Sequence, residues 1–238
     1  TANDVDSPKA EIAAQRLSAL NSDINITTYP VKLDAGNALD IIANFDIVLD
    51  GTDNFSTRYM INDACALLQK PLIFGAVSQF EGQVSVFNVP DAENKLSNYR
   101  DLFPDAPGDQ EIPNCAEAGV IGILPGIIGT MQAAEVIKLI TGLGKPLAGR
   151  LLTFNVLNNL SYEISYSASG THAPSSREEF QNMHYQITCG VAEPSITEID
   201  ASQLKALISA PSTLVIDVRE LNEMPRLYGI EHREIPMS

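Results

Sequence analysis

Short apolar runs alternate with stretches of helical spacing along the first two thirds of the chain. Runs rich in β-branched residues indicate strands, and apolar positions three or four residues apart indicate helices. Helices are predicted over 7–21, 37–42 and 56–68, and the first of them is expected to bury Ile12, Ala13, Leu17 and Leu20. Strands are predicted over 24–33, 45–50, 71–77, 82–88 and, as one or two strands, 150–166.

The longest apolar run spans residues 118–129. A membrane span is rejected because a proline and four glycines interrupt this run and charged residues follow it. The pattern instead predicts a buried helix over 125–141 that ends at Gly142, since glycine is favoured just past a helix. Close packing of backbones is expected at three glycines of this region, Gly122, Gly126 and Gly129.

The order of the predicted elements indicates an α/β fold. Strands that alternate with helices form doubly wound, Rossmann-like, mostly parallel sheets. The strands over 71–77 and 82–88 are separated by too few residues for a crossover, so we expect an antiparallel pair there. A second unit is predicted after a boundary near residue 190, with a helix over 201–208 and a buried strand over 213–220. The predicted domains are therefore 1–190 and 191–238.

The net charge limits the class of binding partner, and the cysteines indicate the cellular compartment. The formal net charge is −15, which disfavours nucleic acid or an anionic membrane as a partner and suits a protein with a basic face. The three cysteines form no CxxC pair. We therefore expect no disulfide framework, and a reducing cytoplasm is the default location.

A polar stretch, Asp50-Gly51-Thr52-Asp53-Asn54, follows the strand over 45–50. That strand is apolar enough to be buried on both faces in the middle of a parallel sheet. Ligands of open α/β sheets bind where strands end and helices begin, so the two carboxylates indicate a nucleotide and metal site. The alternative is structural: either aspartate can cap the next helix, and Gly51 can simply form the turn.

Five motifs in fixed order carry a resemblance to a known family. They are Pro8-Lys9, Asp50–Asn54 with Arg58, Gly82-Gln83-Val84, Asn114–Val120 with Cys115, and Gly129–Lys138. Over about residues 7–165 the chain resembles the MoeB/ThiF branch of the ubiquitin-activating-enzyme superfamily. The segment Leu214–Glu220 resembles the opening of a rhodanese domain, which is often fused to this family.

The resemblance implies an ATP-dependent adenylyltransferase and sulfurtransferase. Such an enzyme adenylates the C-terminal Gly-Gly of a small ubiquitin-like sulfur-carrier protein, and sulfur then displaces AMP to give a thiocarboxylate for molybdopterin, thiamine or a related pathway. It also implies a homodimer. Two rival functions stay open: activation of a different Gly-Gly protein or peptide, and a non-catalytic module that only docks the carrier.

The resemblance also assigns roles to individual residues. Asp53 matches the Mg²⁺ ligand, Lys9 the lysine that contacts the phosphates, and Cys115 the cysteine that joins the carrier covalently. Asn54 and Arg58 lie with them at the nucleotide site and either orient Asp53 or only brace the start of the helix. From the residues alone, Lys9 can equally be a solvated lysine and Cys115 a small buried side chain.

The chain departs from the family pattern in three places. It has no Gly-x-Gly-x-x-Gly loop to hold phosphates, so alone it is expected to bind ATP poorly and to be a fragment of a longer enzyme. Where relatives carry two zinc-binding CxxC pairs, residues 97–101 have no cysteine and residues 186–190 have one, so zinc is not expected. A rhodanese active-site cysteine would lie beyond Ser238.

Overall fold

The computed structural model describes most of the chain, namely residues 4–104, 119–169, 173–185, 207, 213–217 and 232–234. Internal contacts divide the chain into two units, residues 1–190 and 191–238. Among the described residues of both units, no helix is both long and apolar enough to cross a bilayer.

The second unit is described only in short segments. Strands β6 (Ile216–Asp217) and β7 (Arg233–Glu234) pair in parallel, and β6 lies within the strand predicted over 213–220. The predicted helix over 201–208 falls outside the described residues except for Leu207. The assignment of this unit to a rhodanese domain stays a prediction.

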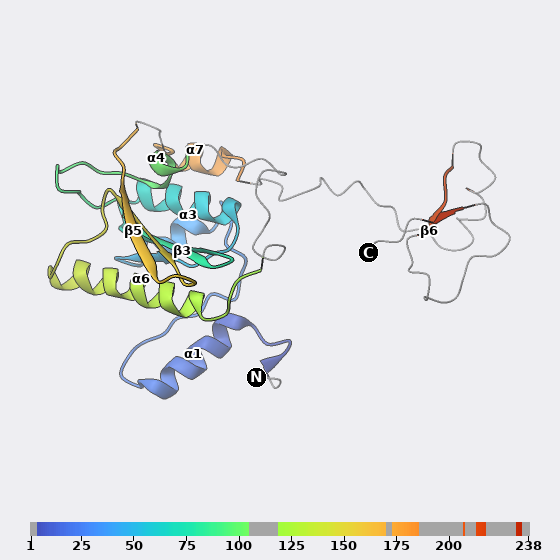
Figure 1. The fold of residues 1–238 in the computed structure, drawn as a ribbon, viewed down its shortest axis with the longest axis horizontal. Coiled ribbons are helices and arrows are strands. Elements are labelled where there is room, and N and C mark those ends of the chain that lie inside the picture. Colours follow the sequence, from blue (N-terminus) through green and yellow to red (C-terminus); the bar gives the residue numbers. More distant parts are fainter. Residues whose placement is uncertain are drawn as a thin grey trace. The chain divides into compact units, whose positions relative to one another are not determined.

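The first unit is built on one five-stranded sheet (Figure 1). The strands follow their order in the chain: β1 (Val48–Asp50), β2 (Leu72–Ser78), β3 (Glu81–Phe87), β4 (Arg150–Asn155) and β5 (Leu160–Ser165). Only β1 and β2 are parallel, and the three later pairs are antiparallel. The α/β class and the antiparallel β2–β3 pair are confirmed. The expectation of a mostly parallel sheet is wrong for the described strands, because the β2–β3 and β4–β5 connections are too short for crossovers.

Strand β1 differs from the prediction in its position. Among the described strands it pairs with β2 alone, so it lies at the sheet edge rather than in the middle. Its residue Leu49 is 48% exposed, and burial on both faces is therefore wrong. The apolar run predicted the strand itself correctly, but such a run cannot show whether a second neighbour covers its outer edge.

Helices cover both faces of the sheet (Figure 1). Helix α3 (Phe55–Leu67) connects β1 to β2 and packs on one face with α4 (Tyr99–Leu102), and α6 (Leu124–Thr141) packs on the other. Side chains along β2 alternate between the two layers: Phe74 belongs to the α3 side, whereas Ile73 belongs to the α6 side. The loop after β1 thus lies where a parallel strand meets a helix.

Two predictions for the amino-terminal region need correction. Residues 24–33 form no strand, because no described strand pairs with them. Helix α1 (Lys9–Leu20) forms as predicted, but it buries none of its residues, and Leu17 and Leu20 are 48% and 84% exposed. Alternating or helical spacing shows what a segment can form, but it does not supply a surface to pack against. The short helix α2 (Ala38–Ile42) is confirmed and buried.

Helix α6 confirms the predicted helix and its end, but the expected burial is wrong for its outer face, where Ile137 and Ile140 are 59% and 71% exposed. Gly142 adopts the left-handed conformation, with φ 68°, and donates its N–H to the Lys138 carbonyl. The expected close approaches at Gly122, Gly126 and Gly129 are wrong, since a Cβ there would meet no described atom within 4 Å. The close approaches to α6 occur instead at two glycines of the sheet, Gly75 and Gly82.

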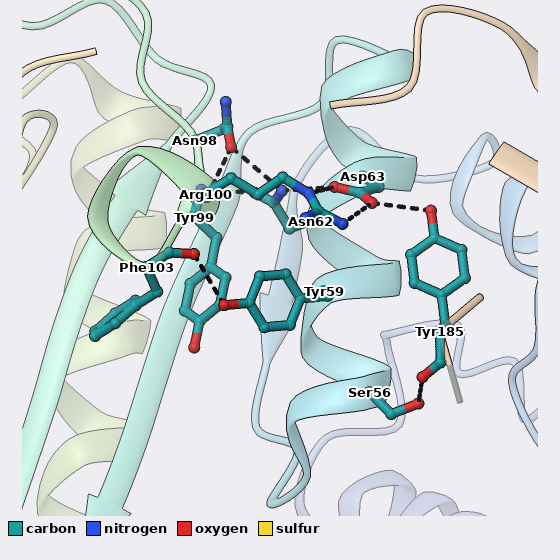
Figure 2. Close-up of polar contacts among 9 residues, drawn as sticks. All are labelled: Ser56, Tyr59, Asn62, Asp63, Asn98, Tyr99, Arg100, Phe103 and Tyr185. Atoms are coloured by element: carbon teal, nitrogen blue, oxygen red, sulfur yellow. Dashed lines mark hydrogen bonds and ion pairs between the residues drawn. The ribbon is translucent and has the colours of Figure 1, made fainter. Parts of the chain in front are cut away.

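A buried polar cluster fastens two later segments onto α3 (Figure 2). Asp63 of α3 is fully buried and accepts bonds of 2.8 and 2.7 Å from Arg100 of α4, and one of 2.9 Å from the Tyr185 hydroxyl. Ser56, in the first turn of α3, donates to the Tyr185 carbonyl. We call Asp63, Arg100 and Tyr185 the Asp63 cluster. It holds segments 37 and 122 residues away from Asp63.

Candidate active site

The loop between β1 and α3 is fixed by a buried carboxylate. Asp50 ends β1 and is fully buried. Its Oδ1 accepts bonds from the backbone N–H and the hydroxyl of Thr52, at 2.8 and 2.7 Å. This side chain is therefore committed to shaping the loop, and of the two carboxylates that the sequence placed here, Asp50 is not the one that solvent can reach.

Arg58 holds the same loop through a backbone carbonyl. Its guanidinium donates to the Thr52 carbonyl at 2.6 Å and lies 5.1 Å from the centre of the Phe74 ring. Its Nε and Asp50 Oδ2 lie 3.4 Å apart. This is an ion pair by distance, but neither atom makes a hydrogen bond with a described residue. These contacts favour the bracing role for Arg58, and contact with a nucleotide stays a prediction.

Asn54 begins helix α3. Its side-chain oxygen accepts a 2.8 Å bond from the backbone N–H of Thr57, which is the usual function of asparagine at a helix start. The contact favours a structural role for Asn54 and places the positive end of the helix dipole beside the preceding residue.

That preceding residue, Asp53, is exposed. No hydrogen bond among the described residues uses its carboxylate. Mg²⁺ is commonly held by one or two carboxylates together with water and phosphate oxygens, so a single exposed aspartate at this place fits the ion. No group of three or more potential metal-binding side chains occurs within the described ranges.

No hydrogen bond or ion pair among the described residues joins Lys9 to this loop. Lys9 is exposed at the start of α1, where it lines an open groove with other residues of positions 4–17 and none of positions 50–58. Cys115 lies outside the described residues. Four positions later, Gly119 accepts a 3.1 Å bond from the N–H of Gln79, which directly follows β2. The chain after Cys115 thus returns to the carboxyl end of β2, the strand parallel to β1.

Sequence reasoning missed one side chain at this site. Gln132, on α6, is 6% exposed, and its amide donates to the Asp50 carbonyl at the carboxyl end of β1 and to the Ile73 carbonyl near the amino end of β2. The signal was a polar residue in helical spacing with the apolar residues Leu124 and Ile128, on the side of α6 that faces the sheet. The sequence does not show which buried groups such an amide would meet.

Cys65, expected to be a core residue, is fully buried in α3. Burial, helped by the negative charge of Asp50, raises the pKa of its thiol from the ordinary 9.0 to about 12.

We expect iodoacetamide at pH 8 to leave Cys65 unmodified in the folded chain and to alkylate it in urea, as mass spectrometry of the Cys65 peptide would show. Because the folded pKa is raised, the thiol stabilises the fold below pH 9, and that contribution is lost as the pH rises from 9 toward 12. Equal labelling with and without urea would contradict the burial.

The chain is similar to two named adenylyltransferases. The chain is 50% identical over 158 residues to the sulfur carrier protein adenylyltransferase of Thermus thermophilus, covering 66% of this chain and 58% of that protein. It is 41% identical over 190 residues to the probable adenylyltransferase/sulfurtransferase MoeZ of Mycobacterium tuberculosis, covering 79% and 47%. The chain thus spans about half the length of these relatives.

Solved structures support the same fold. A crystal structure of E. coli MccB with MccA-N7isoASN matches with a TM-score of 0.61 at 17% identity, covering 74% of this chain and 54% of that one. At this identity the likeness shows the Rossmann-like fold alone. The sequence model of the ThiF family matches residues 1–173 of the chain. With most of its length matched and the parallel β1–α3–β2 unit in place, the chain belongs to the ThiF family.

Proposed function

We propose that the whole protein adenylates the C-terminal Gly-Gly carboxylate of a small ubiquitin-like sulfur-carrier protein. The observation that carries the proposal is Asp53, an exposed carboxylate between a parallel strand and a helix start, on a loop that Asp50 and Arg58 hold in place. The relative from Thermus thermophilus, named for the same activity, supports it. The carrier would belong to the molybdopterin, thiamine or a related pathway.

The reaction requires charge stabilisation more than covalent chemistry from the protein. The carrier carboxylate attacks the α-phosphorus of ATP, an O–P bond forms, and pyrophosphate leaves. Bound Mg²⁺, with Asp53 as its ligand, would gather phosphate oxygens and offset their charge. Lys9 would act as a point cation toward the phosphates. The fixed loop keeps the Asp53 carboxylate in one place while the bond forms.

In the second step, a sulfur nucleophile displaces AMP from the carrier adenylate. We propose that the Cys115 thiolate attacks the carbonyl carbon of the carrier adenylate, so that a thioester forms as AMP leaves. Where a sulfur donor has converted Cys115 to a persulfide, its outer sulfur attacks in the same way and gives an acyl disulfide, again with release of AMP. The anchoring of Gly119 beside the end of β2 supports this role, because four extended residues span at most about 14 Å. The name of the relative MoeZ, which joins the two activities, supports the pairing of adenylation with sulfur transfer.

A homodimer is part of the proposal, as the resemblance implies. Sedimentation equilibrium of the full-length gene product measures it, and a monomer at micromolar concentration would contradict it.

Carrier-dependent ATP–pyrophosphate exchange tests the proposal directly. We would measure exchange with a Gly-Gly carrier for this chain and for the full-length gene product. We expect exchange by the full-length product and little by this chain, because these 238 residues contain no Gly-x-Gly-x-x-Gly loop. A carrier lacking its last two glycines is the control. Failure of the full-length product with every Gly-Gly carrier would contradict adenylation and favour a docking module.

The division between the two steps predicts the effect of Cys115→Ala. We expect this variant of the full-length product to keep exchange at the wild-type rate, because adenylation precedes attack by sulfur. We expect it to lose the covalent carrier adduct, which non-reducing gels and mass spectrometry detect. Cys65→Ala is the control that keeps the adduct. Loss of exchange in Cys115→Ala would contradict this division of roles.

A further inference from the structure

We infer that Gln132 is a positioning residue for Asp53, which it holds in place by binding the carboxyl end of β1, from which the loop departs, and joining it to β2. This inference rests on the proposed function for its catalytic consequence. The Gln132 Nε2 donates to the Asp50 carbonyl at 2.8 Å and to the Ile73 carbonyl at 3.2 Å. Asp50 is the last residue of β1 and Ile73 is the second residue of the parallel strand β2, so a single amide from α6 joins the carboxyl end of β1 to β2.

The contact requires a matching gap in the sheet, and Gly75 of β2 provides it. A Cβ on Gly75 would lie 2.4 Å from the Gln132 Cδ, closer than two carbon atoms can approach. The amide of Gln132 therefore reaches the Asp50 and Ile73 carbonyls only because the residue it passes on β2 is a glycine. The neighbouring sheet-facing residues of α6, Leu124 and Ile128, pack in an apolar cluster. A buried amide in such a layer is costly unless it is hydrogen-bonded, and here two backbone carbonyls satisfy it.

The contacts continue without interruption from Gln132 to the loop. The Asp50 carbonyl is bound by Gln132, the Asp50 carboxylate is bound by Thr52, and the Thr52 carbonyl is bound by Arg58. The next residue is Asp53, whose carboxylate is exposed. Three successive restraints thus end at the group that would bind the metal. Because a displacement of about 1 Å can cost about 100-fold in rate, removal of the first restraint is expected to affect the reaction.

Two variants test the inference by independent routes. Gln132→Met keeps the length of the side chain and removes the donor, whereas Gly75→Ala keeps the donor and displaces it. Each has a matched control. Ser85→Ala removes a buried 2.8 Å bond to the Arg150 carbonyl in β4, and Gly82→Ala crowds α6 at Ile128, 2.3 Å from the new Cβ. Neither control touches Gln132.

Two readouts separate positioning from stability. The first, measured on this chain, is hydrogen exchange at the Thr52 amide, which we expect to accelerate at least 10-fold in Gln132→Met and Gly75→Ala and to stay unchanged in the controls. The second, measured on the full-length gene product, is the Mg²⁺ concentration that half-saturates ATP–pyrophosphate exchange. We expect it to rise about 10-fold in the same two variants alone.

The outcomes are distinguishable. Unchanged Thr52 exchange in a folded Gln132→Met chain overturns the inference. So does faster Thr52 exchange with an unchanged Mg²⁺ requirement, because the loop would then loosen without consequence for Asp53. If the wild-type full-length product has no activity, the proposed function fails, and Thr52 exchange alone then decides whether Gln132 holds the loop.

Discussion

Asp53→Ala is expected to lower carrier-dependent ATP–pyrophosphate exchange by at least about 100-fold in the full-length gene product. Removing one preorganised electrostatic group from an active site typically costs about 10² to 10³ in rate, and Asp53 is the exposed carboxylate of the loop. The thermal midpoint is expected to stay unchanged, because no hydrogen bond among the described residues uses this side chain. Exchange kinetics and differential scanning calorimetry on the same preparation measure both quantities.

Asp46→Ala is the matched control for this experiment. Asp46 is also exposed and lies four residues before the end of the same strand region, so its removal changes the net charge equally. We expect wild-type exchange from this variant. An Asp53→Ala protein that exchanges at the wild-type rate would remove Asp53 from the site and, with it, the main support for the proposed chemistry.

Arg100→Met is expected to lower the free energy of unfolding by about 3–5 kcal/mol. It leaves Asp63, which is fully buried, without its cation, and removing one partner of a buried ion pair leaves an uncompensated charge. The Tyr185 hydroxyl and the Asn62 amide still donate to Asp63, but neither carries a positive charge. Urea unfolding of this chain, followed by circular dichroism, measures the loss.

Two further variants control this prediction. Arg177→Met removes an ion pair with Asp40 in which both side chains are more than half exposed, and no shift of the urea midpoint is expected because solvent screens such pairs. The double variant Arg100→Met with Asp63→Leu is expected to recover most of the loss, since an apolar pair leaves no buried charge. A single variant as stable as Arg177→Met would show that Asp63 does not depend on Arg100.

Local patterns predicted the elements around the site correctly. The apolar run that ends at Asp50, the helix that follows and the glycine-terminated α6 are each encoded by neighbouring residues. The antiparallel β2–β3 pair followed from the short predicted connection, residues 78–81, which cannot hold a crossover. The same patterns were wrong where the outcome depended on a distant partner: residues 24–33 lack a neighbouring strand, and the apolar positions of α1 lack a surface.

The contacts that hold the site could not be predicted for the same reason. Gln132 binds a carbonyl 82 residues away, and Tyr185 binds a carboxylate 122 residues away. Spacing within a segment carries no information on such pairs. The local pattern also did not distinguish Asp50 from Asp53, although the family resemblance singled out Asp53, because only the fold shows that one turns into the core and the other toward solvent.

The Asp63 cluster has a mechanical consequence. Tyr185 is the last residue described before the boundary at residue 190, and both its hydroxyl and its carbonyl are bound to α3. A pull applied at Tyr185 would therefore act on α3, through Asp63 and Ser56. The helix that bears this load is also the one whose first turn bounds the Asp53 loop.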